Sequence, residues 1–302
     1  MKTPVAFEVI GLGAATVDYL WLVDEFHSTE GVWKSSGHAR MGGGPVASAL
    51  AVLAHFGTNT ALVDVCGDDE AGRWLFRDFE RLNVDTCFLQ KQPGHSTARA
   101  IVLVRQGDGA RQIHYLPSSA GEPILTKQCR AAIAAAKILH LNGRHDAVAV
   151  DAAQVAREAG TLISFDGGAG RYRAELRPLV EAADLRIVSR EFAARYAGSD
   201  AIELQMSALS QVPARVVVVT DGAHGSYGLD SAGGIHHQPA HPVCPGLVDT
   251  TGCGDVYHGA FLHGWLQGWG LERCMEFASR LAALNASGLG GRFVCTLEPV
   301  AS

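Results

Sequence analysis

One stretch near the end of the chain combines residue types that could act on a phosphate group. Residues 248–255 read Val-Asp-Thr-Thr-Gly-Cys-Gly-Asp and lead into an apolar run at 256–261. Glycines followed by an acid and a helix-compatible run predict a loop that feeds a helix N-terminus. The first N–H groups of a helix have no partner within it and the helix dipole is positive there, so this end binds anions.

The acid in this stretch, Asp255, would stand beside the anion pocket. A carboxylate in this place could accept a proton from a hydroxyl group whose oxygen attacks a bound phosphorus atom. The same pattern would arise from a plain helix cap, in which Asp255 serves only by its charge. Both interpretations remain open on the residues alone.

Several short apolar runs predict the β-strands that would position this site. Residues 138–141, 162–165, 185–188 and 216–219 are short, mostly apolar runs, which are typical of parallel strands buried on both faces. Each run ends in small or polar residues, and in open α/β sheets ligands gather at the carboxyl ends of the strands. These ends are Asn142-Gly143-Arg144, Asp166-Gly167-Gly168, Ser189 and Thr220-Asp221-Gly222.

The first part of the chain predicts further strands and helices of two kinds. Residues 5–10 and 60–65 suit buried strands, and residues 45–56, 70–82 and 275–286 suit helices. Residues 16–23, 98–104 and 111–115, the last two joined by a turn at 107–109, suit a separate small sheet. We therefore predict one α/β domain over residues 1–302, with a mostly parallel central sheet and small-sheet strands within 14–41 and 97–117.

Composition limits the classes of function. The formal net charge is −6, so no basic face is expected for nucleic acid or for a membrane surface. The seven cysteines are widely spaced without a C-x-x-C pair, which favours reduced thiols and a cytoplasmic location. We see no signal peptide pattern and no apolar run of transmembrane length.

Two nucleotide-binding alternatives are weakened by missing residues. Gly11 and Gly13 begin a dinucleotide-binding fingerprint, but Thr16 stands where its third glycine is needed, so an NAD-dependent dehydrogenase has little support. No Walker A lysine motif is found in the sequence, which removes the P-loop kinases.

Two motifs resemble those of a known family. Asp249-Thr250-Thr251-Gly252-Cys253-Gly254-Asp255 is similar to the D-T-x-G-A-G-D signature of the PfkB, or ribokinase-like, carbohydrate kinases, and residues 42–49 (Gly-Gly-Gly-Pro-Val-Ala-Ser-Ala) resemble its upstream glycine motif. Cys253 replaces the usual alanine, but the family uses the backbone N–H at this position. The resemblance implies a three-layer ribokinase-like sandwich whose small sheet is a lid over the sugar. It also implies transfer of the γ-phosphoryl group of ATP to a sugar hydroxyl.

The resemblance assigns roles by position. Asp255 would be the general base, and Gly252, Cys253 and Gly254 would supply N–H groups to the anion hole. The remaining assignments are Asp18, Gly42 and Gly43 for the sugar, Thr220, Gly222, Gly225 and Ser189 for the nucleotide, and Asp249 and Thr251 for a monovalent cation such as K⁺. Magnesium would accompany ATP, although the family's N-x-x-E motif is matched poorly, with Ser189 and Phe192 at its two defining positions. A homodimer through the lid is also implied, and a non-catalytic sugar-binding or regulatory protein on this fold is the alternative.

The substrate expected from these residues is an anionic sugar. Ala47 replaces an asparagine that helps the family to bind simple sugars, and residues 42–47, 237–240 and 255–260 look closest to the branch of bacterial sulfofructose kinases. Arg144, at a strand end, could grip a sulfonate or phosphate group, aided by Lys34 or Arg99 from the lid. The alternative is that Arg144 is an ordinary exposed loop residue.

Overall fold

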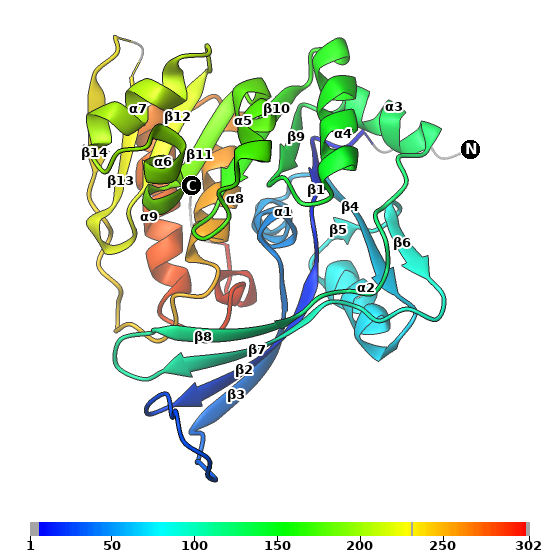
Figure 1. Cartoon of the computed structure of the whole chain (residues 1–302), viewed down its shortest axis with the longest axis vertical. Helices are drawn as coiled ribbons and strands as arrows, with labels where there is room; N and C mark the ends of the chain where they lie inside the picture. The colour runs from blue at the N-terminus through cyan, green and yellow to red at the C-terminus, as the bar shows by residue number, and fades with distance from the viewer. Residues whose placement is uncertain (1–5, 231, 300–302) are drawn as a thin grey trace.

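A large, mostly parallel sheet forms the centre of the protein (Figure 1). The computed structural model describes residues 6–230 and 232–299. The ten strands of this sheet within those residues are, in spatial order, β14 (Ile235–Gln238), β13 (Ser226–Leu229), β12 (Val216–Thr220), β11 (Leu185–Ser189), β10 (Leu162–Gly167), β9 (Ile138–Leu141), β1 (Val9–Leu12), β4 (Thr60–Gly67) and β5 (Val84–Asp85), with β6 (Leu89–Gln92) paired to β4. Pairing is parallel from β12 to β5 and antiparallel at β13 and β14.

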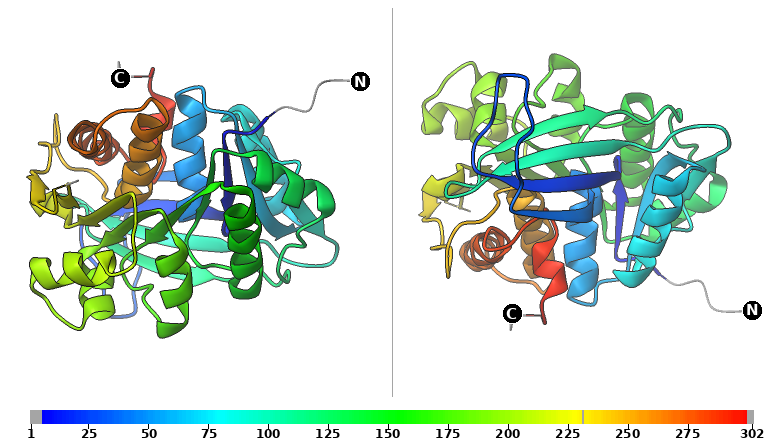
Figure 2. Two further views of the ribbon diagram at one scale, coloured as in Figure 1. Left: turned by 90° about the horizontal axis from the view of Figure 1, so that it is seen from above. Right: turned by 90° about the horizontal axis from the view of Figure 1, so that it is seen from below.

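Helices cover both faces of this sheet because its strands are apolar on both sides. One buried cluster joins the sheet to α1 (Pro45–His55), α2 (Glu70–Arg81), α8 (Cys253–Leu266) and α9 (Leu271–Asn285). A second joins the other face to α3 (Lys127–Ala135), α4 (Asp146–Ala159), α5 (Arg177–Ala182), α6 (Arg190–Ala197) and α7 (Ile202–Ser210). The left view of Figure 2 shows the sheet between these two layers, and the predicted three-layer α/β fold is confirmed.

A second, four-stranded sheet lies across the carboxyl ends of the parallel strands (Figures 1 and 2). Its order is β3 (Gly37–Gly43), β2 (Thr16–Val23), β7 (Arg99–Arg105) and β8 (Arg111–Leu116). Leu20, Ala100, Val102 and Val104 form its buried inner face. The prediction of strands at 16–23, 98–104 and 111–115 is therefore confirmed, whereas β3 was not predicted because glycine and polar residues dominate it.

Some predicted boundaries are wrong. The strand expected at 5–10 is β1, which begins at Val9, and residue 5 lies outside the described residues. The helix expected at 275–286 begins four residues earlier, at Leu271. Within the described residues no helix has the length and hydropathy to cross a membrane. All seven cysteines are free thiols.

Candidate active site

The N-terminus of α8 is built around a glycine in the left-handed region. Gly252 has φ 70°, and a Cβ atom there would lie 2.5 Å from the Cα atom of Gly291. Only glycine fits such a position without strain and collision. Gly252 is the N-cap and Cys253 the first residue of the helix, so the loop feeding a helix N-terminus is confirmed.

Gly254 does not take part in the turn before α8, although the sequence suggested that both Gly252 and Gly254 would. It lies inside the first helical turn, its φ is not positive, and a Cβ atom added to it would meet nothing within 4 Å. The turn therefore depends on Gly252 alone. The absent side chain of Gly254 leaves open space beside the unpaired N–H groups of the helix, where an anion can approach closely.

Asp255, two residues into α8, is half-buried and lies among several charges. Burial and the negative charge of Asp166 raise the pKa of Asp255 to about 6, against the opposing charges of Arg171, His258 and Arg111. At neutral pH this carboxylate is mostly ionised and yet more basic than an exposed aspartate. Both properties suit a group that must accept a proton.

A buried contact between an aspartate and a histidine, which the sequence analysis did not predict, lies close to Asp255. Asp166 is the penultimate residue of β10, and its Oδ1 atom lies 3.2 Å from Nε2 of His258, which is one turn along α8 from Asp255. Both side chains are buried, and Oδ2 of Asp166 has no hydrogen-bond partner among the described residues. The sequence did place Asp166 at the edge where ligands gather, which was the available signal.

The carboxylate of Asp249 joins the loop before α8 to the loop after α9. Its Oδ1 accepts a hydrogen bond from the N–H of Thr251 (2.8 Å), and its Oδ2 accepts one from the N–H of Gly290 (2.8 Å). Asp249 is fully buried, and the Oγ1 atom of Thr251 is buried without a hydrogen-bond partner in the described part of the chain. Asp249 thus holds the loop in place whether or not a cation binds there.

The predicted sugar residues Asp18 and Gly43 lie against each other. A Cβ atom on Gly43 would lie 2.0 Å from Oδ2 of Asp18, so any other residue would displace this carboxylate. The hydroxyl of Thr16 donates to Oδ1 of Asp18 (2.7 Å). Burial raises the pKa of Asp18, against the hydrogen bond from Thr16. Asp18 keeps one oxygen for a ligand hydroxyl.

A buried arginine, also missed from the sequence, supports the backbone of this glycine pair. The guanidinium of Arg292 donates to the carbonyl of Gly43 (2.9 Å) and to the hydroxyl of Ser48 (3.1 Å), and it pairs with Asp78 (3.1 Å). A Cβ atom on Gly42 would lie 2.2 Å from Nη1 of Arg292. Gly42 therefore makes room for the arginine that positions Gly43, and need not itself contact a sugar.

Arg144 borders a cavity of about 490 Å³ between the carboxyl ends of β1, β4 and β9 and strand β8 of the small sheet. The exposed Arg144 side chain lies 3.5 Å from the hydroxyl of Tyr115, and it forms no ion pair with a carboxylate within residues 6–230 and 232–299. The full lining is Ala14, Ala15, Asp64, Val65, Ala98, Tyr115, Ser118, Ala120, Gly121, Glu122, Arg144, His145, Asp146 and Arg173.

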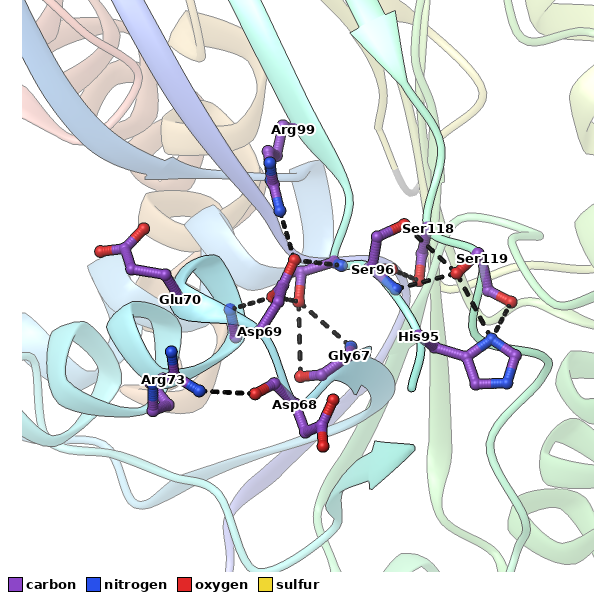
Figure 3. Close-up of polar contacts among 12 residues, drawn as sticks. Gly67, Asp68, Asp69, Glu70, Arg73, His95, Ser96, Arg99, Ser118 and Ser119 are labelled. Atoms are coloured by element: carbon purple, nitrogen blue, oxygen red, sulfur yellow. Dashed lines mark hydrogen bonds and ion pairs between the residues drawn. The ribbon is translucent and has the colours of Figure 1, made fainter. Parts of the chain in front are cut away.

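The other cations expected to assist Arg144 do not line this cavity. Arg99 pairs with Asp69, which also accepts hydrogen bonds from Gly72 and Thr97 (Figure 3). Although burial acts in the opposite direction, these hydrogen bonds lower the pKa of Asp69 to about 2. Lys34 lies in the exposed loop between β2 and β3. The expectation that Arg99 is available for an anionic sugar is wrong, because its charge is already paired.

The predicted nucleotide residues lie at the ends of β11 and β12. Ser189 and Thr220 are paired neighbours in the sheet, and both are partly exposed. Gly222 and Gly225 follow in a turn with positive φ, and a Cβ atom on Gly225 would lie 2.0 Å from the carbonyl oxygen of Gln238. The structure therefore brings these four residues together at the carboxyl ends of β11 and β12, next to β10, which carries Asp166.

The segment at the place of the N-x-x-E motif cannot act as that motif does. Ser189 caps α6 by accepting a hydrogen bond from the N–H of Phe192 (3.2 Å), and Phe192 is buried against Phe165. Phe192 therefore belongs to the core and leaves no carboxylate there.

The glycines that suggested a dinucleotide site have a packing role. Cβ atoms on Gly11 and Gly13 would lie 2.6 and 2.8 Å from the Val46 side chain of α1. These glycines let β1 approach α1 closely, which accounts for both without a dinucleotide.

Comparisons with known proteins identify the family of this chain. The family model "pfkB family carbohydrate kinase" matches residues 8–297. The chain is 28% identical to the ATP-dependent ribose-1-phosphate kinase of Halopiger xanaduensis, with 97% of each chain covered, and 26% identical to a nucleoside kinase of Methanothermobacter thermautotrophicus, with 91% of this chain and 88% of the relative covered. The crystal structure of a putative ribokinase from Agrobacterium tumefaciens superposes with a TM-score of 0.85 at 25% identity, covering 95% of this chain and 93% of that one.

The fold and the matched signature define a ribokinase-like phosphotransferase that acts on an alcohol group. The chain belongs to the PfkB family of carbohydrate kinases and is an ATP-dependent sugar or nucleoside kinase. The dehydrogenase and the non-catalytic binding protein considered from the sequence are thereby set aside.

Proposed function

We propose that this kinase transfers the γ-phosphoryl group of ATP to a hydroxyl of a sugar that carries a phosphate or sulfonate group. The observation that carries the proposal is Arg144, a guanidinium at the cavity below β8 with no carboxylate partner in the described structure. A guanidinium can bind either anionic group through two parallel hydrogen bonds. The sulfofructose kinase branch remains one form of this proposal.

The other charges of the cavity are largely engaged. Arg173 pairs with Asp146 and donates to the carbonyl of Gly143 (2.7 Å). Asp64 accepts hydrogen bonds from His145 (2.9 Å) and from the N–H of Ala15. The remaining carboxylate, Glu122, is exposed at the rim. Arg144 is thus the cation that retains its capacity to bind a ligand.

A relative supports the same class of substrate. The Halopiger xanaduensis protein that this chain matches over 97% of its length is named for a phosphorylated sugar, ribose 1-phosphate. We infer a similar substrate class here, without assigning the same sugar, since the identity is 28%.

In the proposed reaction the sugar lies between Asp18 and Asp255. Asp18 accepts hydrogen bonds from sugar hydroxyls, while Asp255 accepts the proton of the attacking hydroxyl. The oxygen–phosphorus bond to the sugar forms as the bond from phosphorus to the ADP oxygen breaks. The N–H groups at Gly252, Cys253 and Gly254 stabilise the charge on the transferring group. Ser189, Thr220, Gly222 and Gly225 line the nucleotide side.

Magnesium would be held chiefly by the ATP phosphates and water. No cluster of three or more His, Cys, Asp or Glu residues that could bind a metal is found in the described residues, which fits a metal carried by the nucleotide. Asp166, with one buried oxygen lacking a partner, is the protein carboxylate best placed to support it in the absence of an N-x-x-E glutamate. When bound, magnesium would neutralise phosphate charge. Potassium at Asp249 and Thr251 remains a prediction, favoured by the unpartnered Thr251 hydroxyl.

A panel of sugars tests the proposal. Wild-type kcat/KM, read by ADP release, should be higher for ketoses and pentoses bearing a terminal phosphate or sulfonate than for their neutral parents. Arg144→Ala should raise KM for the anionic sugar about tenfold or more, the order of one charge-assisted bidentate contact, and change KM for the neutral sugar little.

Glu122→Gln is the matched control, because it removes the opposite charge from the same cavity. It should lower KM for the anionic sugar or leave it unchanged. A wild-type preference for neutral sugars, or equal losses on both sugars in Arg144→Ala, would contradict the assignment.

We also propose a homodimer through the outer face of the small sheet, and a cytoplasmic location. Trp21 and Ile101 expose 43% and 50% of their surface on this face, which a partner would cover. The seven free thiols suit a reducing compartment. Sedimentation of the wild type and of Trp21→Lys tests the dimer; a monomeric wild type would exclude it.

A further inference from the structure

His145, which lines the cavity beside Arg144, has an unusual backbone conformation. It precedes α4 with φ 60° and ψ 64°, in the left-handed region, and its side chain does not cap the helix. Among the non-glycine residues that the structure describes, only Asn83 also has a positive φ. A residue with a Cβ atom costs about 1–2 kcal/mol in this region, so the contacts of the His145 ring must offset that cost.

A buried carboxylate holds the ring of His145. Its Nε2 atom lies 2.9 Å from Oδ1 of Asp64, and the exposed fractions of the two side chains are 8% and 3%. Oδ2 of Asp64 accepts a hydrogen bond from the N–H of Ala15 (2.7 Å). Asp64 lies in the fully buried strand β4, where a charged group requires such partners. Because an ionised carboxylate only accepts hydrogen bonds, Nε2 of His145 carries a hydrogen.

The second ring nitrogen of His145 is left for a ligand. Nδ1 forms no hydrogen bond within residues 6–230 and 232–299, and it is not one of the fully buried polar atoms that lack a partner there. It therefore meets the open cavity that the residue lines. When Nδ1 also carries a hydrogen, the ring is positively charged and offers this N–H to the cavity.

The charges around His145 come from several elements. The titratable and charged residues that line the same cavity are Asp64, Tyr115, Glu122, Arg144, Asp146 and Arg173. Asp146 pairs with Arg173, and Glu122 is exposed at the rim. Arg144 and His145 thus remain as two adjacent residues that can both donate to one anionic group.

We propose that His145 is a specificity-determining residue that binds the terminal phosphate or sulfonate group of the sugar through Nδ1, beside the guanidinium of Arg144. The imidazole takes up one proton from solvent as the anionic group binds. Nε2–H then donates to Asp64 and Nδ1–H to an oxygen of the ligand, so that the charged ring lies between two negative groups. The class of sugar is that of the proposed function, on which this role of His145 rests.

A neutral sugar should gain little from this arrangement. It brings no negative charge to hold the second proton on the ring, so Nδ1 can only accept one hydrogen bond from a hydroxyl. Loss of the ring should therefore weaken an anionic sugar about tenfold or more, the order of one charge-assisted hydrogen bond, and weaken its neutral parent by less than about twofold.

Calorimetry with a non-hydrolysable ATP analogue and magnesium measures this difference without turnover, and the analogue occupies the anion-binding end of α8. The probes are 6-deoxy-6-sulfofructose and ribose 1-phosphate, each compared with fructose or ribose as its neutral parent. His145→Gly suits the left-handed backbone, and His145→Gln keeps an N–H donor for Asp64 but has no Nδ1. Both should selectively weaken at least one anionic sugar. Asn83→Gly, the matched control at the other left-handed residue, should change no affinity.

The proton gives a second readout that a merely structural role would not move. At about pH 7.5 the binding heat of the anionic sugar should vary with the ionisation heat of the buffer, and the wild type should take up more protons than His145→Gln. Equal losses on anionic and neutral sugars, unchanged affinity in both His145 variants, or equal proton uptake would each overturn the role of His145.

Arg144→Ala distinguishes this failure from that of the proposed function. A selective loss of the anionic sugar in Arg144→Ala, with none in either His145 variant, would overturn the role of His145 and leave the anionic substrate in place. No selective loss in any of the three variants would contradict both.

Discussion

The pH dependence of catalysis follows from the environment of Asp255. This carboxylate must be ionised to accept the proton of the sugar hydroxyl, so kcat/KM should rise as pH increases through its pKa. Because burial and the charge of Asp166 raise that pKa to about 6, kcat/KM should be about half its plateau at pH 6 and about one tenth of it at pH 5. An exposed aspartate would leave the rate nearly constant over this range.

The assay must exclude other groups that titrate near pH 6. A phosphate monoester has its second pKa there, so a sulfonated or neutral sugar is the appropriate substrate. ATP and magnesium are kept saturating, and fluorescence at each pH checks that the protein stays folded. The negative phosphates of bound ATP can only move the midpoint upward. An acid limb centred at or below about pH 4 would refute the reasoning.

Three further changes have distinct expected outcomes. Gly252→Ala should lower both Tm and kcat, since an alanine in the left-handed region costs about 1–2 kcal/mol and its Cβ atom would also collide with Gly291. Gly254→Ala should keep Tm but lower kcat, because its methyl group fills the open space beside the helix N-terminus. Thermal melts and ADP release distinguish the two variants. Asp166→Asn should move the acid limb of kcat/KM to lower pH, because the charge that raises the pKa of Asp255 is removed; an unchanged limb would contradict this. Arg292→Met should lower the free energy of unfolding by about 2 kcal/mol or more, because it removes the buried partner of Asp78, which then pairs only with the more exposed Arg81. A loss below about 1 kcal/mol in chemical denaturation would show that the buried pair matters little.

Features that depend on residues close together in the sequence were predicted well. Buried runs such as Val216–Thr220 identified the parallel strands, and the end of each strand identified the edge where the site lies. The Gly-Cys-Gly-Asp loop was placed correctly at a helix N-terminus. Local pattern and a family motif suffice for these features because short-range geometry fixes them.

The features that were missed depend on contacts between distant segments. His145 lies against Asp64, 81 residues away along the chain, and the strand that carries Asp64 reads as an ordinary buried one. Arg292 stands in a glycine-rich loop, yet it is one of the most buried side chains because Asp78, far along the chain, pairs with it. Arg99 likewise pairs with Asp69, 30 residues away along the chain, so it is not free to bind an anionic sugar as the sequence analysis expected.

The most direct test of the central claim is single-turnover phosphoryl transfer by Asp255→Asn. The amide has the shape of the carboxylate but cannot accept the hydroxyl proton, so kcat should fall by about two orders of magnitude or more while ATP affinity and Tm remain near those of the wild type. Turnover near the wild-type rate would show that another group takes the proton and that the α8 N-terminus has been assigned the wrong chemistry.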